Sequence, residues 1–408
     1  MIDMNARKVK GEQLAKTVQI EKKGLDKWIV PSQTGSGTYT VNREGENFKC
    51  SCPDYELRGQ VCKHIYAVEI KVMKWFDSEG NSGTEITIKK TYTQDWQAYD
   101  KSQKEEKIRF MELYKDLLEN VDEPVYQFGR PKIAIRDMLF SSGLKVYTQF
   151  SLRRFQSDLA IAKEKGFIGH TASFTGIGKF MQNKEITPIL HKLIMLSSMP
   201  LVSVEEKFGV DSTGFRTTLY TEYCKEKHGI KRHHEWLKVH AICGVKTNII
   251  TEIRVEDGNS ADSPQFMPLV NGTAQNGFTI TEVSGDKAYL SRNNLDGVAK
   301  LGGVAYIPFK SNSQQHGRGS RVWNKMFHYF EMCNEEYMQH YHLRSNIETT
   351  FSMIKAKFND TVKSRDLTAQ INEALLKVLC HNIVVLIHEV NELGIEAKFE
   401  CIKSGDIV

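Results

Sequence analysis

The chain has 408 residues, 40% hydrophobic and 26% charged, which is enough for two or three domains with buried cores. The stretch Met1–Lys16 has no apolar core, so we expect no secretory signal, and the eight cysteines are not arranged as the disulfide framework of a small secreted domain. With a net charge of +5 the composition is that of an ordinary soluble protein, expected in the cytoplasm.

Near the N-terminus, three cysteines and a histidine follow the spacing C-x-C-x9-C-x-H. Three thiolates and one imidazole suffice for a closed tetrahedral Zn²⁺ site, which is structural because no position is left open. The expected ligands are Cys50, Cys52, Cys62 and His64, after short strands at Trp28–Pro31, Thr38–Val41 and Glu46–Cys50. The spacing, the Pro after the second ligand and the apolar helix after the histidine resemble the SWIM-type zinc finger. Whether such a module contacts DNA or protein stays open.

A linker and a charged helix are expected next. Asp77–Thr84 is rich in Gly and Ser, as in flexible linkers, and Tyr99–Asn120 has the composition of a charged helix.

A basic segment follows, in which residues 126–182 hold nine Lys/Arg against three Asp/Glu. This excess indicates contact with a phosphate backbone, and Arg153 and Arg154 are candidate DNA-binding residues. Four short helices are expected, the first from Pro131 to Ser142 before Gly143, the second from a Ser151 cap to Gly166, the third over Thr175–Gln182 and the fourth capped at Thr187-Pro188. They fit a helix-turn-helix-like DNA reader or, alternatively, a basic helical linker domain.

The next segment alternates apolar and polar residues as β-strands do. Phe208 and Val210 lead to Asp211, where Ser212, Thr213 and Gly214 break the pattern, so we expect this Asp at a strand end. Further strands are expected at Trp236–Val245 and Asn248–Glu256, and a fourth ends at Gly285, with Asp286 just past it. Asp211 and Asp286 are therefore candidate catalytic carboxylates. Asp257, in a DG turn, and Asp262, at the start of a helix through Val270, are explained by turn and cap roles.

The C-terminal part contains Tyr341, Arg344, Glu348 and Lys355 on one side of an expected single helix, within an arc of about 60°. Ile347, Phe351 and Ile354 form an adjacent apolar stripe that would anchor it. A carboxylate is thereby held beside two cations and a phenol. This combination suits metal binding next to a polyanion.

The pattern Y-x2-R-x3-E-x6-K, together with the G-D-K-A-Y string at Gly285–Tyr289, resembles DDE transposases of bacterial and archaeal insertion sequences. The resemblance implies that Asp211, Asp286 and Glu348 bind catalytic Mg²⁺ or Mn²⁺ and that Tyr341, Arg344 and Lys355 contact the DNA of the element ends. It also implies strand cleavage at the inverted repeats, transfer of the 3′-OH into target DNA, an active homodimer and association with the nucleoid. The 61 residues between Asp286 and Glu348 leave little room for the large β-rich insertion of some relatives, so a hairpin mechanism is in doubt.

The expected fold is α/β, an RNase H-like mixed sheet flanked by helices, preceded by a small zinc-binding ββα-like module and a basic helical domain. We place the zinc module at 1–76, the linker and charged helix at 77–125, the basic domain at 126–198, the catalytic domain at 199–395 and a tail at 396–408. Ala374–Val390 is apolar but interrupted by Lys377, His381 and Asn382, and is expected to close the core instead of spanning a membrane. Two rival functions are a metal-dependent DNA nuclease and a domesticated DNA-binding protein derived from a transposase.

Overall fold

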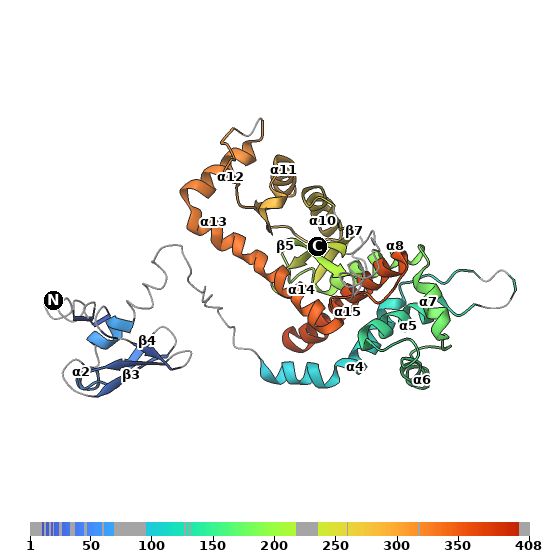
Figure 1. The fold of residues 1–408 in the computed structure, drawn as a ribbon, viewed down its shortest axis with the longest axis horizontal. Helices are drawn as coiled ribbons and strands as arrows, with labels where there is room; N and C mark the ends of the chain where they lie inside the picture. Colours follow the sequence, from blue (N-terminus) through green and yellow to red (C-terminus); the bar gives the residue numbers. More distant parts are fainter. Residues whose placement is uncertain are drawn as a thin grey trace, which may run out of the picture. The chain divides into compact units, whose positions relative to one another are not determined.

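The computed structural model describes residues 10–68, with short internal gaps, and residues 95–399, with gaps at 126–127, 130–131, 218–235, 259 and 317–318. The chain divides into two units, Met1–Thr91 and Tyr92–Val408, each considered by itself (Figure 1). The expected linker Asp77–Thr84 lies outside the described residues.

The N-terminal unit is a four-stranded antiparallel sheet in the order β1-β2-β3-β4. Trp28, Val30 and Val41 are buried and alternate with half-buried or exposed residues, as expected for a sheet with one covered face. The three predicted strands are confirmed, with Glu46 outside the described residues, and the short α2 begins at Pro53. The elements are β1 (Glu21–Lys22), β2 (Lys27–Pro31), β3 (Thr38–Glu44), β4 (Asn47–Cys50) and α2 (Pro53–Arg58).

The second unit is built around a mixed five-stranded sheet in the order β7-β6-β5-β8-β9. β5 pairs antiparallel with β6 and parallel with β8, so the chain must cross over between β7 and β8, which it does through helix α10. The expected mixed sheet flanked by helices is confirmed, and β9 is an additional strand. The bounds are β5 (Lys207–Arg216), β6 (Trp236–Gly244), β7 (Ile250–Asp257), α10 (Ser263–Gln275), β8 (Glu282–Gly285) and β9 (Val304–Tyr306).

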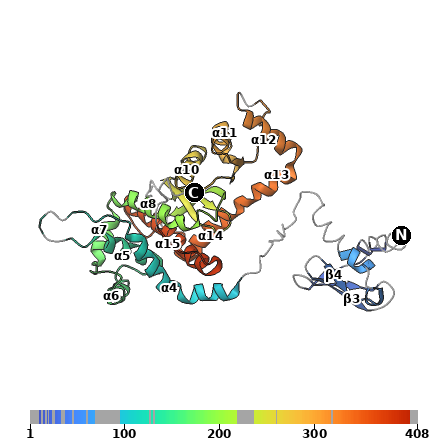
Figure 2. The ribbon, with the colours of Figure 1, turned by 180° about the vertical axis from the view of Figure 1, so that it is seen from behind.

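The two faces of this sheet bury two separate hydrophobic clusters. Phe208 and Val210 of β5 point into the cluster formed with α10 and α11 (Arg292–Lys300). Val239 and Ala241 of β6 point to the other face, into the cluster formed with α8 (Ile186–Ser198), α14 (Ser345–Phe358) and α15 (Leu367–Leu393). Because strand side chains alternate between faces, this segregation follows from the sequence pattern. Both views of the ribbon show α10 and α11 on one side of the sheet and α14 and α15 on the other (Figures 1 and 2).

The helices before the sheet share the hydrophobic cluster of the α15 face. The expected charged helix and the third expected helix are confirmed by α4 and α7. The second helix begins at Gln156 and lacks a side-chain cap, so the predicted Ser151 cap is wrong; Ser151 precedes a turn at residues 152–155 that leads into the helix. The fourth begins at Ile186, one residue before the predicted Thr187 cap. The bounds are α4 (Trp96–Leu118), α5 (Ile135–Thr148), α6 (Gln156–Glu164), α7 (Phe174–Met181), α8 (Ile186–Ser198) and η1 (Met199–Leu201).

Helix α5 continues through Gly143, where the sequence predicted its end. The glycine serves packing instead, because an added Cβ would lie 2.3 Å from Cε1 of the buried Tyr114. The Tyr114 hydroxyl donates to the carbonyl of Leu139, 2.8 Å away, so the ring cannot move aside freely. Gly143 is therefore needed for the close packing of α5 against the Tyr114 ring and does not end the helix.

Gly143→Ala should lower the free energy of unfolding by about 1–3 kcal/mol, because overpacking displaces Tyr114. The matched control is Gly178→Ala in α7, where an added Cβ meets only Leu152 Cδ1 at 3.8 Å. That variant should keep or gain stability, since Ala is favoured over Gly in a helix interior. Urea denaturation of the full chain compares them, and equal stability of the two variants would contradict the packing role.

Helix α15 (Leu367–Leu393) crosses the core and is longer than the expected Ala374–Val390. By length and composition alone it could cross a membrane, but 89% of its most apolar window is buried inside the protein. Its polar residues are bound there. Lys377 Nζ donates to the carbonyls of Asn359 and Thr361 at 2.8 and 2.9 Å, and the Asn382 amide pairs with both backbone groups of Ile250. The expected core-packed helix is confirmed.

Between the candidate carboxylates Asp286 and Glu348 the chain is mostly helical. Apart from residues 317–318, which are not described, it contains only one three-residue strand, β9. This agrees with the expectation that no large β-rich insertion fits here. The elements are η2 (Lys287–Tyr289), α11, β9, α12 (Arg321–Met332), α13 (Asn334–Tyr341) and η3 (His342–Arg344).

Candidate functional site

Asp211 and Asp286 are positioned by two adjacent parallel strands. The register pairs Val210 of β5 with Gly285 of β8, and each Asp is the next residue in its strand direction. Neighbouring strands lie about 4.8 Å apart, so the two backbones present both Asp side by side. The negative charge of Asp286 is close enough to contribute to raising the pKa of Asp211.

The prediction that Asp211 ends its strand is wrong. β5 continues to Arg216, because Ser212, Thr213 and Gly214 pair with His240, Val239 and Lys238 of β6. What ends at this point is the parallel pairing with β8, which stops at Gly285. Asp211 therefore lies where one edge of β5 becomes free of its parallel partner.

Glu348 comes from α14 (Ser345–Phe358), which Ile347, Phe351 and Ile354 anchor as buried residues, as predicted. The single helix expected from Tyr341 to Lys355 is wrong in detail. Tyr341 ends α13, and the 3-10 segment η3 intervenes before α14. The break tightens the backbone just before Glu348.

Arg344 links the first and third candidate carboxylates. Its Nη1 donates to Asp211 Oδ2 and its Nη2 to Glu348 Oε1, each at 2.5 Å. The guanidinium also lies 5.8 Å from the centre of the Tyr341 ring. The side chains of Arg344 and Asp211 are 19% and 18% exposed, whereas Glu348 is 54% exposed, so the Asp211 pair is the more shielded one. The guanidinium thus neutralises charge between carboxylates from β5 and α14.

Burial is the main cause that raises the pKa of Asp211 above its usual value. The Ser212 N–H and Arg344 act in the opposite direction, while the charges of Glu348 and Asp286 add to the rise. A carboxylate whose ionisation is disfavoured by burial and by neighbouring acids is stabilised by a nearby cation. In this arrangement Arg344 fills part of that role.

The residues of this region fit a hard divalent cation. Carboxylate oxygens are the ligands that Mg²⁺ and Mn²⁺ prefer. Among the described residues, however, the only cluster of three or more His, Cys, Asp or Glu residues whose ligand atoms gather closely enough to hold a metal ion lies in the N-terminal unit. The three carboxylates are therefore not drawn together as tightly as bound ions would hold them, and the Arg344 side chain occupies space between Asp211 and Glu348.

Tyr289 is a neighbour whose role the sequence did not indicate, although it closes the G-D-K-A-Y string. It is 1% exposed, and its buried hydroxyl has no hydrogen-bond partner among the described residues. Burial first, and then the charge of Asp211, raises its pKa above the usual range. An unpaired buried hydroxyl close to carboxylates is the kind of group that an ordered water satisfies.

Asp262 precedes α10, but its side chain makes no cap hydrogen bond, so the predicted capping role is wrong. The carboxylate instead accepts from Ser212 Oγ at 2.9 Å and lies 2.8 Å from Lys238 Nζ. Two neighbouring strands thus draw it away from the helix end, and Lys238 compensates its charge. Asp257 ends β7, immediately before Gly258, as expected for its turn.

The other candidate DNA-binding residues lie on two separate parts of the second unit, helix α14 and the turn before α6. Lys355 lies on α14 with its Nζ 5.9 Å from the centre of the Phe215 ring. Arg153 and Arg154 are exposed in the turn before α6, and Arg153 lies over the ring of Phe174 at 5.2 Å. These two arginines are not brought to the carboxylates by any contact among the described residues.

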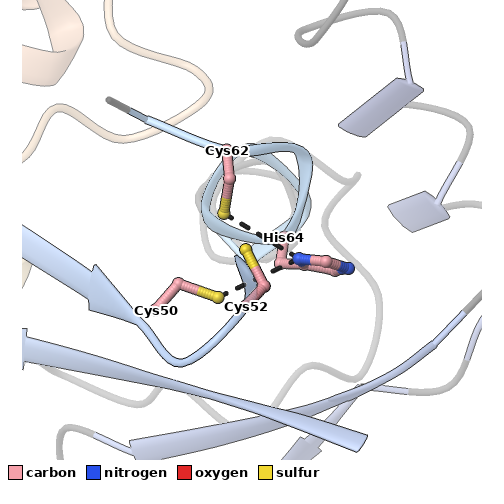
Figure 3. Close-up of side chains that lie close together, drawn as sticks. All are labelled: Cys50, Cys52, Cys62 and His64. Atoms are coloured by element: carbon pink, nitrogen blue, oxygen red, sulfur yellow. Dashed lines mark hydrogen bonds between the residues drawn. The ribbon is translucent and has the colours of Figure 1, made fainter. Parts of the chain in front are cut away.

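The four predicted zinc ligands converge in the N-terminal unit. Their ligand atoms all lie within 4.8 Å of one another, and all four residues are buried. His64 Nδ1 is 3.9 Å from Cys50 Sγ and 3.8 Å from Cys62 Sγ. Figure 3 shows the side chains of Cys50, Cys52, Cys62 and His64 directed toward a common centre, with Cys50 at the end of β4.

These distances fit a tetrahedral Zn²⁺ site, in which ligand atoms are roughly 3.5–3.8 Å apart for Zn–S and Zn–N bonds of about 2.3 and 2.0 Å. The hydrogen bond between Cys50 and Cys62 raises the pKa of Cys50 and lowers that of Cys62. Without a cation the thiols therefore share protons instead of ionising together. A zinc ion would let all of them act as thiolates.

Two family models match parts of the chain. Residues 203–383 match the family model described as the transposase DDE domain, and residues 39–73 match the SWIM zinc finger. The first range includes Asp211, Asp286 and Glu348, and the second includes the four zinc candidates. Among solved structures, the chain is similar to the piggyBac transposase in a cryo-EM synaptic complex with hairpin DNA, with 10% identity, 71% of this chain and 74% of that chain covered, and a TM-score of 0.34.

A DDE domain implies a divalent metal and a DNA substrate, and the Cys/His cluster in the matched finger indicates zinc. These matches show that the chain carries an N-terminal SWIM zinc finger and a transposase DDE domain, and they support its identification as a DNA transposase.

Proposed function

We propose that Asp211, Asp286 and Glu348 are the metal-binding carboxylates of this transposase and that they hold Mg²⁺ or Mn²⁺. The observation that carries the proposal is the parallel register of β5 and β8, which puts Asp211 beside Asp286, together with the Arg344 bridge from Asp211 to Glu348. One cation-binding locus thereby receives an acidic residue from each of three elements. The reaction is strand cleavage at the element ends, followed by transfer of the freed 3′-OH into target DNA.

Two such ions, when bound, activate the attacking oxygen and stabilise the leaving oxygen of the phosphodiester. The chain's own residues prepare this chemistry. β5 and β8 hold two carboxylates on a rigid sheet, and the buried face of α14 holds the third. Arg344 balances their charge and, once released from Asp211, is placed to donate to a DNA phosphate. Tyr341 packs against that guanidinium, and Lys355 adds a second cation on α14.

The transposase works on the inverted repeats as a homodimer associated with the nucleoid. A strand-transfer assay distinguishes this proposal from a simple nuclease. DNA carrying the inverted repeats that flank the gene is incubated with supercoiled plasmid and Mg²⁺, Mn²⁺ or Ca²⁺. We expect joined products with Mg²⁺ or Mn²⁺, and none with Ca²⁺. Cleaved ends without any joined product would favour the nuclease.

Arg344→Ala should separate metal binding from DNA binding. Removing the guanidinium frees Asp211 and Glu348 and deletes a positive charge, so Mn²⁺ should bind about tenfold more tightly without DNA. Binding of the element end should weaken, with a salt dependence reduced by about one phosphate contact. Electron paramagnetic resonance measures free Mn²⁺, and a salt series of gel shifts measures the DNA affinity.

Lys357→Ala is the matched control, because it removes a cation from the same helix whose partner is Glu106. Its Mn²⁺ affinity should equal that of the wild type. If Arg344→Ala left both the Mn²⁺ affinity and the salt slope unchanged, Arg344 would be a structural ion pair and the proposed locus would lose its support.

A further inference from the structure

An open cleft of about 340 Å³ begins next to Asp211 and is distinct from the carboxylates. Ser212, Thr213 and Gly214 of β5 line one side, and Trp236 and Lys238 of β6 line another. Within the described residues, β8 no longer pairs with β5 after Val210, and the next contact on that edge is the bridge from Arg216 to Thr361. The cleft thus lies along the free part of the β5 edge, starting one residue from a catalytic carboxylate.

Two glycines, Gly214 and Gly258, leave the space that Trp236 occupies in this cleft. A Cβ at Gly214 would lie 2.9 Å from Cε3 of the indole, and a Cβ at Gly258 would lie 3.0 Å from the Trp236 carbonyl oxygen. The indole is therefore held close to the β5 backbone, yet the residue remains 49% exposed. Within the described part of the chain its Nε1 has no hydrogen-bond partner. A large aromatic surface is fixed on one side and open on the other.

Two lysines line the cleft, and they differ in whether the ammonium group already has a partner in the protein. Lys238 is already engaged, with its Nζ 2.8 Å from Asp262 and donating to the Ser260 carbonyl at 2.9 Å. Lys355, half-buried on α14, makes no ion pair or hydrogen bond among the described residues. The ammonium group of Lys355 is therefore the cation of this cleft that is available to a ligand.

An aromatic face and a free cation that line one cleft are the combination that binds a nucleotide, since the base stacks on the ring and the phosphate meets the charge. We propose that this cleft binds one unpaired nucleotide of the DNA strand that enters the catalytic site, with its base stacked on Trp236 and its phosphate near Lys355. The site reads no sequence, because every base has a stacking face. The inference rests on the proposal that Asp211 belongs to the catalytic locus, which fixes the strand next to the cleft.

Binding of a fluorescent single-stranded oligothymidylate to the full chain tests the proposal, with no divalent metal added and no chelator, so that zinc is retained. The comparison probe is the same oligonucleotide with abasic sites. Trp236→Ala should weaken binding of the oligothymidylate about tenfold, within the range of roughly 5- to 150-fold for one stacked base. The abasic probe should bind equally to both proteins, because it has no base to stack.

Trp236→Phe should recover much of the affinity by keeping a ring, and Trp96→Ala is the matched control, because Trp96 is 68% exposed on α4 and lines no part of the cleft. A probe with 5-iododeoxyuridine should cross-link to the peptide containing Trp236.

Equal weakening of both probes, no weakening, or a change of oligomeric state alone on Trp236→Ala would overturn the proposal. Asp211→Asn should bind the oligothymidylate at least as well as the wild type, because it removes a negative charge near the DNA. This assay measures binding without cleavage, so a negative result for the Trp236 cleft can be distinguished from a negative result for the metal site.

Discussion

Asp211→Asn should abolish strand cleavage and leave DNA binding intact or slightly tighter. An amide of the same shape keeps the packing of β5 but removes the charge that would hold a divalent ion. A metal-stabilised transition state is worth several kcal/mol, and each 1.36 kcal/mol is a factor of ten in rate, so the loss should be on the order of 10³-fold or more. Asp286→Asn and Glu348→Gln should behave alike, as measured by cleavage of labelled element ends.

The affinity for the same DNA, measured by gel shift, is the companion measurement. Deleting a negative charge next to a polyanion cannot weaken its electrostatic attraction, so binding should not fall. Asp262→Asn is the discriminating variant, because this acid also lies near Asp211 but is neutralised by Lys238. It should retain cleavage within about tenfold. Complete loss of cleavage in Asp262→Asn, with activity remaining in Asp286→Asn, would mean that the second ligand is misassigned.

Cys62→Ser should remove one tightly bound Zn²⁺ per chain and unfold the N-terminal module. The buried core of this module is small and includes the ligands Cys50, Cys52 and Cys62 themselves. Structural zinc in small domains contributes about 10–16 kcal/mol, which equals or exceeds the typical stability of a whole domain, about 5–15 kcal/mol. Metal analysis gives the zinc stoichiometry, and hydrogen exchange reports which residues lose protection.

The second unit should keep its protection in the same experiment, because it has its own core and forms a separate compact unit. Cys333→Ser, which changes an exposed cysteine of that unit, is the matched control and should retain zinc. Protein prepared without chelator that contains no zinc, or a Cys62→Ser protein that keeps it, would rule out the finger as a metal site.

Most of the sheet could be predicted from the sequence because its signals are local. The alternation of Phe208 and Val210 marked β5, and the apolar runs after Trp236 and Asn248 marked β6 and β7. The zinc ligands were predictable for the same reason, since ligands within a short span require no knowledge of the remaining fold.

The errors arose where a distant partner overrides a local pattern. Ser212–Gly214 have a turn-like composition, but hydrogen bonds to β6 keep them in the strand. Gly143 has the composition of a helix stop, but Tyr114, 29 positions away, explains the glycine. The side chain of Asp262 is captured by Lys238 instead of the helix end. No periodicity marked Tyr289 or Trp236, whose positions depend on strand pairing.

The pairing of β5 with β8 restricts which insertions and deletions the chain can tolerate. The separation of Asp211 and Asp286 is determined by four backbone residue pairs, Lys207–Val210 with Glu282–Gly285, and the ion pair between Lys207 and Glu282 adds a side-chain link at the far end of this ladder. A slip of one residue would turn Asp286 toward the opposite face, whereas lengthening the surface loops between the strands would leave it in place. Substrate preference can therefore diversify through the loops, while the alignment of the ladder keeps Asp211 and Asp286 side by side.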